Sequence, residues 1–116
     1  MFEGAGVDKR YSIMDIDEVF FNSSFEEKNN IYMKEITKLA EESLKKSLKK
    51  VILKPTDIDY IITVSCTGIM IPSVDAYLIN NLKMKHDITR LPVTEMGCVA
   101  GVSGIIYAKN FLKSTF

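Results

Sequence analysis

The sequence predicts one α/β domain over residues 1–116, in which helices pack around a mostly parallel sheet. Helical and strand patterns alternate in the order helix, strand, helix, strand, helix, which is typical of a layered α/β fold. The first strand is a continuous apolar run, as expected for a strand covered on both faces. Two strands are few, since sheets usually have about four to six. The chain is therefore expected to be part of a larger domain or to pair with a second copy.

The helix before the first strand is the clearest predicted element. Ser24 and Glu27 match the capping-box pattern that begins many helices. Apolar residues then recur at steps of three and four, which gives the helix one apolar face. These apolar residues are Met33, Ile36, Ala40, Leu44 and Leu48. The opposite face carries lysine and glutamate and is expected to face water. A shorter helix is predicted at residues 14–21, and Pro55 lies in the break after the long helix.

Two strands and two further helices follow this break. Residues 57–66 predict a strand, and residues 67–72 a loop. Residues 72–82 predict a helix, because proline at position 72 is favoured in a first helical turn. Residues 87–96 predict the second strand, with a proline near its end, and a helix is expected from Gly97 onward.

Composition excludes several classes of protein. The formal net charge is +0 at pH 7, so there is no electrostatic case for a nucleic-acid partner. No apolar run approaches the about 20 residues of a membrane span. The N-terminal residues lack the layout of a signal peptide, which together with only two cysteines predicts a cytoplasmic protein. One histidine and no Cys-x-x-Cys pair give no indication of a zinc site.

The two cysteines are the candidate chemical groups. Cys66 and Cys98 each follow a predicted strand, and parallel strands bring their carboxyl ends to one edge of a sheet, where ligands bind. A thiol at a helix start is favoured as thiolate, the nucleophilic form. Gly97 and Gly101 would let backbone approach closely and leave room for an acyl group. The alternative is that Cys98 is a packing residue, as Cys66 is in the simplest interpretation. His86 lies in a polar loop and is expected to be solvated.

Three motifs in order carry a family resemblance: Cys-Thr-Gly at residues 66–68, Pro-x-x-Asp at 72–75 and Gly-Cys-x-x-Gly at 97–101. With the segment GVDKRY at residues 6–11, they resemble the type III polyketide synthases, the chalcone-synthase-like branch of the thiolase superfamily, and above all its bacterial members. The resemblance begins at about Gly6. It implies a thiolase-like layered fold, of which this chain would be most of one N-terminal half.

The resemblance also implies roles for individual residues. Cys98 matches the nucleophile that takes an acyl group from acyl-CoA, which is then extended by decarboxylative condensation with malonyl-CoA. Cys66 and Thr67 match positions that line the elongation cavity. Ile71 matches a residue that crosses a dimer interface into the partner's cavity, so a homodimer is expected. No metal or prosthetic group is implied, and acyl-CoA thioesters would be the small-molecule partners.

The sequence departs from the family pattern in one important respect. The catalytic His and Asn of the family lie in its second half, and His86 matches neither. Pro72 and Asp75 match a turn and a helix start, and are expected to be structural. Two hypotheses follow. The chain is part of an acyltransferase whose isolated piece lacks turnover, or it is a non-catalytic half-domain that serves as a dimerisation or partner-binding module.

Overall fold

The computed structural model describes residues 4, 6–21 and 24–115. Six helices and strands, with a 3-10 turn before β1 and another before α4, account for most of this part of the chain. They are α1 (Ile16–Phe20), α2 (Phe25–Val51), the turn Pro55–Asp57, β1 (Tyr60–Val64), α3 (Val74–Asn81), β2 (Thr89–Val93), the turn Gly97–Val99 and α4 (Ala100–Thr115). The described part of the predicted 1–116 domain thus has the expected order of helices and strands.

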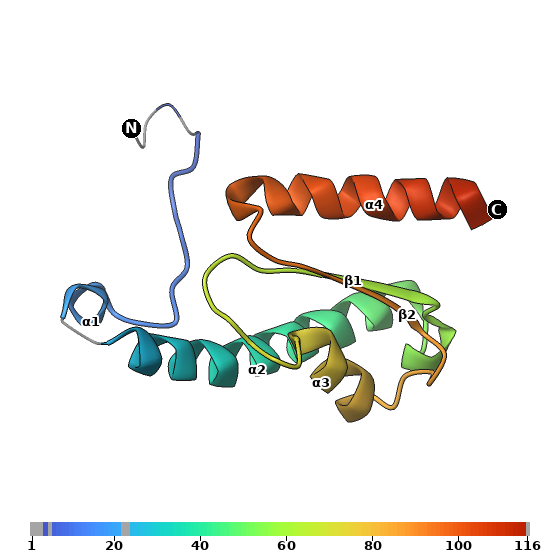
Figure 1. Ribbon diagram of the computed structural model, residues 1–116, viewed down its shortest axis with the longest axis horizontal. Helices are drawn as coiled ribbons and strands as arrows, with labels where there is room; N and C mark the ends of the chain where they lie inside the picture. The colour runs from blue at the N-terminus through green and yellow to red at the C-terminus, as the bar shows by residue number, and fades with distance from the viewer. Residues whose placement is uncertain (1–3, 5, 22–23, 116) are drawn as a thin grey trace.

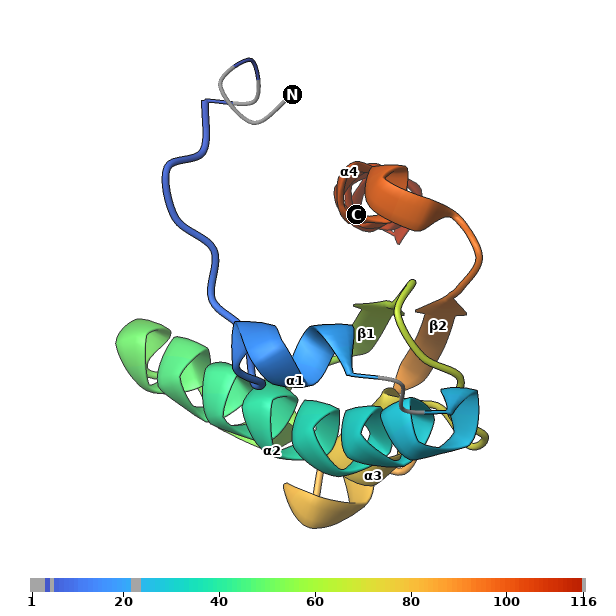
Figure 2. The same cartoon turned by 90° about the vertical axis from the view of Figure 1, so that its left-hand side faces the viewer.

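The strands β1 and β2 form a parallel pair in which Tyr60 lies opposite Thr89 and Val64 opposite Val93. Helices α2 and α3 cover one face of this pair, and α4 covers the other (Figure 1). The view along the long axis shows the strands between these two layers of helices (Figure 2). The predicted α/β class, with helices around a parallel sheet, is confirmed.

Helix α2 forms as its sequence predicts. The Ser24 hydroxyl accepts a hydrogen bond from the Glu27 backbone N–H at 3.2 Å, and the Glu27 carboxylate accepts one from the Ser24 N–H at 2.9 Å. This reciprocal pair satisfies donors that an α-helix leaves unpaired at its start. The helix ends at Val51, because the next residue, Ile52, has a φ of 57° that breaks the helical conformation.

The core lies between the strands and the α2–α3 layer. Its five buried apolar residues come from β1, α3 and the segment before β2: Ile61, Val74, Leu78, Met84 and Ile88. Ile36, Ala40 and Leu44 of the predicted apolar face of α2 pack against this cluster. The opposite face of α2 carries exposed ion pairs one turn apart, such as Lys45 with Glu41. Among the described residues, no helix is both long and apolar enough to cross a bilayer.

Several predicted boundaries were too wide. The helix predicted at residues 72–82 is α3 (Val74–Asn81), so the expected place of Pro72 in its first turn is wrong, because the extended Ser73 precedes the helix. The helix predicted at residues 14–21 covers Ile16–Phe20.

The first strand begins at Tyr60 and not at residue 57, because the Asp57 carboxylate accepts a hydrogen bond from the Lys54 N–H at 2.7 Å and closes a turn. The second strand covers Thr89–Val93 and not residues 87–96. The last α-helix begins at Ala100 and not at residue 97, since a 3-10 turn precedes it.

Candidate active site

The two cysteines lie at one edge of the sheet. Cys66 follows β1 and Cys98 follows β2, and strand pairing continues one residue further because the Ser65 N–H donates to the Val93 carbonyl at 3.0 Å. Cys66, Thr67 and Cys98 line the same pocket, whose volume is about 290 Å³. Both thiols are exposed and free. The predicted shared location is confirmed, while the chemical roles of these residues remain predictions.

A tight turn presents Cys98 at this edge. Glu95 and Gly97 have φ values of 64° and 57°, in the left-handed region that favours glycine. The chain reverses through these two residues, and Cys98 lies in the following 3-10 turn, directly before α4. The first N–H groups of α4 point back toward the same edge, since a helix leaves its first four N–H groups without internal partners.

The glycines after the turn have different structural roles. A methyl group on Gly101 would meet nothing within 4 Å, so this position leaves open space beside the cysteine pocket, which it lines. The close backbone packing predicted at Gly97 and Gly101 is found instead at Gly104. A Cβ there would lie 3.2 Å from Cγ1 of Val64, so Gly104 allows α4 to lie close against β1.

Helix α2 holds the loop that carries Cys66. The Asn29 amide donates to the Ile69 carbonyl at 2.9 Å and accepts from the Ile69 N–H at 2.8 Å. The Tyr32 hydroxyl shares a hydrogen bond with the Ser65 hydroxyl. The Tyr32 ring lies against Gly68, where an added Cβ would be 2.2 Å from Cδ1 of the ring. Sequence patterns missed Asn29 and Tyr32, because they contact residues more than 30 positions away.

Ile71 lies outside the pocket that Cys98 lines. It lines a neighbouring hollow of about 430 Å³, to which Cys66, Thr67 and Glu95 also contribute. The loop therefore separates two hollows, and Cys66 and Thr67 face both of them. Ile71 is 92% exposed, and its expected role at a dimer interface stays a prediction.

A buried carboxylate joins the strands to α3. Asp75 is 0% exposed and accepts hydrogen bonds from Ser73, from Thr63 of β1 at 3.3 Å and from Arg90 of β2. Burial alone would raise the pKa of Asp75, but the hydrogen bonds from Arg90 and Ser73 and the Arg90 charge lower it below its usual range. The predicted structural position of Asp75 agrees with these contacts. Its partner Arg90 was not singled out from the sequence, since the two lie 15 residues apart.

His86 is exposed, as predicted. It lies before the amino end of β2, whereas Cys98 follows the carboxyl end. A five-residue strand is on the order of 15 Å long, which places His86 beyond hydrogen-bond reach of Cys98. Within the described ranges, no cluster of three or more His, Cys, Asp or Glu side chains is arranged to hold a metal ion.

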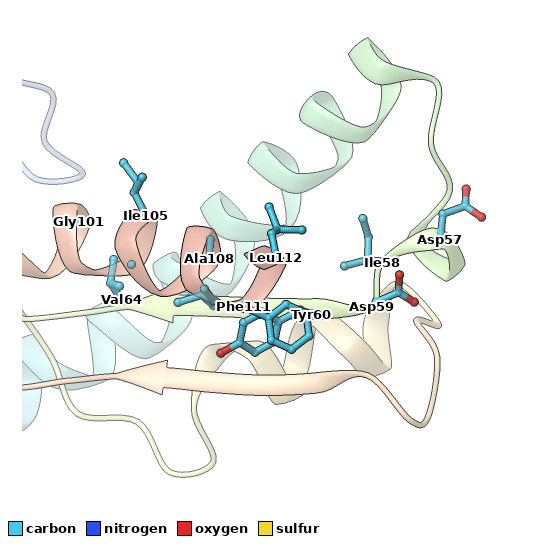
Figure 3. A pocket seen from close by; sticks show the side chains of 12 residues that line it. Asp57, Ile58, Asp59, Tyr60, Val64, Gly101, Ile105, Ala108, Phe111 and Leu112 are labelled. Atoms are coloured by element: carbon cyan, nitrogen blue, oxygen red, sulfur yellow. The ribbon is translucent and has the colours of Figure 1, made fainter. Parts of the chain in front are cut away.

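A larger hollow of about 530 Å³ lies between α4 and β1 (Figure 3). Its walls are mostly apolar, and at one end the rings of Tyr60 and Phe111 approach to 4.0 Å between centroids. Ile105 and Leu112 line it from α4 yet remain largely exposed. This face of α4 is therefore not covered by the described residues.

The fold and the cysteine edge can be compared with known proteins. Residues 14–115 match the family described as FAE1/type III polyketide synthase-like protein. The chain belongs to this family. It is 31% identical to phloroglucinol synthase of Pseudomonas fluorescens over 97% of the chain and 32% of the relative. It is 32% identical to 1,3,6,8-tetrahydroxynaphthalene synthase of Streptomyces griseus over 96% of the chain and 30% of the relative.

A solved structure supports the same conclusion. The crystal structure of 1,3,6,8-tetrahydroxynaphthalene synthase from Streptomyces coelicolor, a bacterial type III polyketide synthase, matches with a TM-score of 0.89 and 34% identity. The match covers 97% of this chain and 32% of that one. The thiolase-like fold expected from the resemblance is confirmed. The chain spans about a third of the length of these relatives.

Proposed function

We propose that this chain carries the acyl-loading site of a type III polyketide synthase, with Cys98 as the nucleophile. The observation that supports this most directly is the turn through Glu95 and Gly97, which presents an exposed thiol beside a pocket at the carboxyl edge of the sheet. A strand, a tight turn, a nucleophile and a helix form the arrangement that exposes catalytic residues in other acyl-transfer enzymes.

In the proposed loading step, the Cys98 sulfur attacks the thioester carbonyl of an acyl-CoA. The bond between the acyl carbon and the CoA sulfur breaks, an acyl-cysteine forms, and CoA leaves as a thiol after taking up the proton. In the complete enzyme, malonyl-CoA then loses CO2 and its carbanion attacks the carbonyl carbon of the acyl-cysteine. A carbon–carbon bond forms, the bond from the acyl carbon to the Cys98 sulfur breaks, and Cys98 leaves as a thiolate. These substrates need no metal or prosthetic group.

The proposal assigns the other site residues to binding. Cys66 and Thr67 would form one wall of the acyl cavity, since both line the pocket with Cys98. Ile71 would project into the cavity of a second copy, which fits its high exposure and makes a homodimer the proposed assembly.

The same geometry leads us to propose that this chain alone does not turn over. A cysteine nucleophile is normally activated by a base within hydrogen-bond reach. His86 lies at the opposite end of β2, so a base and an oxyanion-binding group would have to come from other parts of the complete enzyme.

Mass spectrometry of the chain after incubation with acetyl-CoA, hexanoyl-CoA or malonyl-CoA tests the loading step. We expect a slow acyl adduct on the peptide that contains Cys98 and no released polyketide. Cys98→Ala should abolish the adduct. Val99→Ala is the matched control, because Val99 lies in the same 3-10 turn, is exposed, and does not line the pocket. An adduct that persists in Cys98→Ala would reject Cys98 as the loading residue.

The second candidate is a non-catalytic half-domain that binds a copy of itself or another protein. The observation that favours it is the uncovered apolar face of α4, where Val102, Ile105 and Leu112 are exposed. In that case Cys98→Ala would leave the association state unchanged, and the wild-type chain would form no acyl adduct. Sedimentation that shows only monomer would count against the proposed homodimer and against self-association in this candidate.

A further inference from the structure

Helix α2 supplies one wall of the cysteine pocket. It contributes Tyr32 and Ile36. The other lining residues come from the end of β1, the loop after it, the turn before α4 and the first residues of α4. Tyr32 is half-buried, and its aromatic ring is the only one that lines this pocket among the described residues. Neither the Cys-Thr-Gly motif nor the Gly-Cys-x-x-Gly motif includes this residue.

The position of the Tyr32 ring is fixed at several points. Its hydroxyl is hydrogen-bonded to Ser65, and its ring edge lies where a Cβ on Gly68 would be only 2.2 Å away. Asn29, one turn earlier on α2, holds both the N–H and the carbonyl of Ile69. These contacts place the loop and the ring against each other, so the ring cannot rotate away without breaking the hydrogen bond or displacing the loop.

We propose that Tyr32 is a specificity-determining residue whose fixed ring limits the length of the group that the Cys98 sulfur can carry. A side chain that can change rotamer adapts to a longer ligand, whereas one held at its ring and at its hydroxyl does not. The identity of the group as an acyl chain rests on the proposed function. The limit itself depends only on the pocket that Tyr32 and Cys98 share.

A purely structural role for Tyr32 makes a different prediction. If Tyr32 only holds the loop through Ser65, then Tyr32→Phe, which loses the hydroxyl, should alter the pocket as much as Tyr32→Ala does. If the ring is the wall, Tyr32→Phe keeps the length limit and Tyr32→Ala removes it. The Phe variant is therefore the matched control.

The test uses alkylthiolating probes, so that it does not depend on acyl transfer. In the 116-residue chain with Cys66→Ser, Cys98 is the single thiol, since the sequence has two cysteines. Methyl and octyl methanethiosulfonates react with it. The Cys98 sulfur attacks the sulfenyl sulfur, a disulfide to the alkyl group forms, methanesulfinate leaves, and the thiol proton goes to solvent. The readout is the ratio of the octyl rate to the methyl rate.

We expect Tyr32→Ala to raise this ratio about tenfold, since each methylene that becomes buried contributes a several-fold gain. Tyr32→Phe should change it by less than about twofold, because the ring remains. An unchanged ratio in Tyr32→Ala, or an equal rise in both variants, would overturn the proposal. If Tyr32→Ala loses its helical circular dichroism signal, Tyr32→Leu, which keeps apolar bulk without the ring, is measured in its place.

A second measurement tests the contact that fixes the ring. Gly68→Ala should displace the Tyr32 ring and change the rate ratio, but it should add nothing in the Tyr32→Ala background. Additive effects of the two substitutions would overturn the proposal. Failure of Cys98 to take an acyl group from acyl-CoA, with the rate ratio responding as expected, would reject the proposed function and leave this inference standing.

Discussion

The contact between Asp75 and Arg90 leads to a quantitative prediction about stability. Replacing Arg90 by methionine keeps a long, flexible side chain but removes the charge and the hydrogen bond to the Asp75 carboxylate. The carboxylate is 0% exposed, so water cannot replace the lost partner without movement of the structure. Ser73 and Thr63 would remain as its hydrogen-bond donors.

The expected cost follows from the burial of the two partners. Removing one partner of a buried ion pair typically costs about 3–5 kcal/mol. The Arg90 side chain is 42% exposed, which weakens its attraction to Asp75, so the lower end applies. A hydrogen bond to a charged group contributes about 1.5–3 kcal/mol. Together these values predict a loss of about 2–3 kcal/mol in Arg90→Met.

Urea unfolding followed by circular dichroism measures this loss. For a small domain, a slope of about 1–3 kcal/mol per molar urea converts it into a midpoint lower by about 0.7–3 M. Lys85→Met is the matched control, because Lys85 pairs with Asp59 at the surface and its loss should not move the midpoint beyond experimental error. A midpoint for Arg90→Met equal to that of the wild-type chain would refute the reasoning.

The same carboxylate predicts how stability depends on pH. The pKa of Asp75 is lower in the folded chain than the about 3.9 of an unfolded aspartate. Ionised Asp75 therefore contributes stability that is fully present above about pH 4 and is lost as the pH falls through the folded pKa. In Asp75→Asn this part of the acid dependence should be missing. An unchanged slope of unfolding free energy against pH below pH 4 would contradict this assignment.

Three further substitutions, two of them with a matched control substitution, test local features of the fold. Ser24→Ala removes the cap of α2 and should cost about 1 kcal/mol in urea unfolding. Gly97→Ala places a side chain at a φ of 57° and should cost about 1–2 kcal/mol, whereas Gly101→Ala, with open space around it, should cost nothing measurable in thermal unfolding. Asn29→Ala should release the loop and raise the reaction rate of Cys66 with a thiol reagent, while its exposed neighbour Asn30→Ala should not.

Each of these expectations has a clear contrary result. Equal stability of Ser24→Ala and the wild-type chain would mean that the cap is not needed for α2. An equal loss of stability in Gly97→Ala and Gly101→Ala would mean that the left-handed conformation at Gly97 is not the cause of the loss. A Cys66 rate that Asn29→Ala leaves unchanged would mean that the loop is held without the amide.

Local patterns predicted the elements whose causes lie within a few residues. The capping pair Ser24 and Glu27 and the periodic apolar face gave α2 correctly, because a helix is determined by contacts three and four positions apart. The first strand was predicted too long, since the turn at Pro55–Asp57 before it depends on one side-chain hydrogen bond to a backbone N–H. The parallel arrangement predicted that Cys66 and Cys98 would meet, because topology alone brings strand ends to one edge.

The rest of the site could not be predicted, because it depends on pairs far apart in the chain. Asn29 with Ile69 and Tyr32 with Ser65 join residues 40 and 33 positions apart. Nothing in the local pattern around Tyr32 distinguishes a pocket wall from an ordinary residue on a half-buried helix face.

The thiols of Cys66 and Cys98 are positioned by separate parts of the structure. The loop with Cys66 is held by side chains of α2, whereas Cys98 is positioned by the backbone conformation of Glu95 and Gly97. Energetic effects at sites without shared partners are usually additive. Release of the loop by Asn29→Ala should therefore change the reactivity of Cys66, while the rate at which Cys98 reacts with the short methyl methanethiosulfonate should stay unchanged. The wall of the cysteine pocket can then vary in shape without moving Cys98.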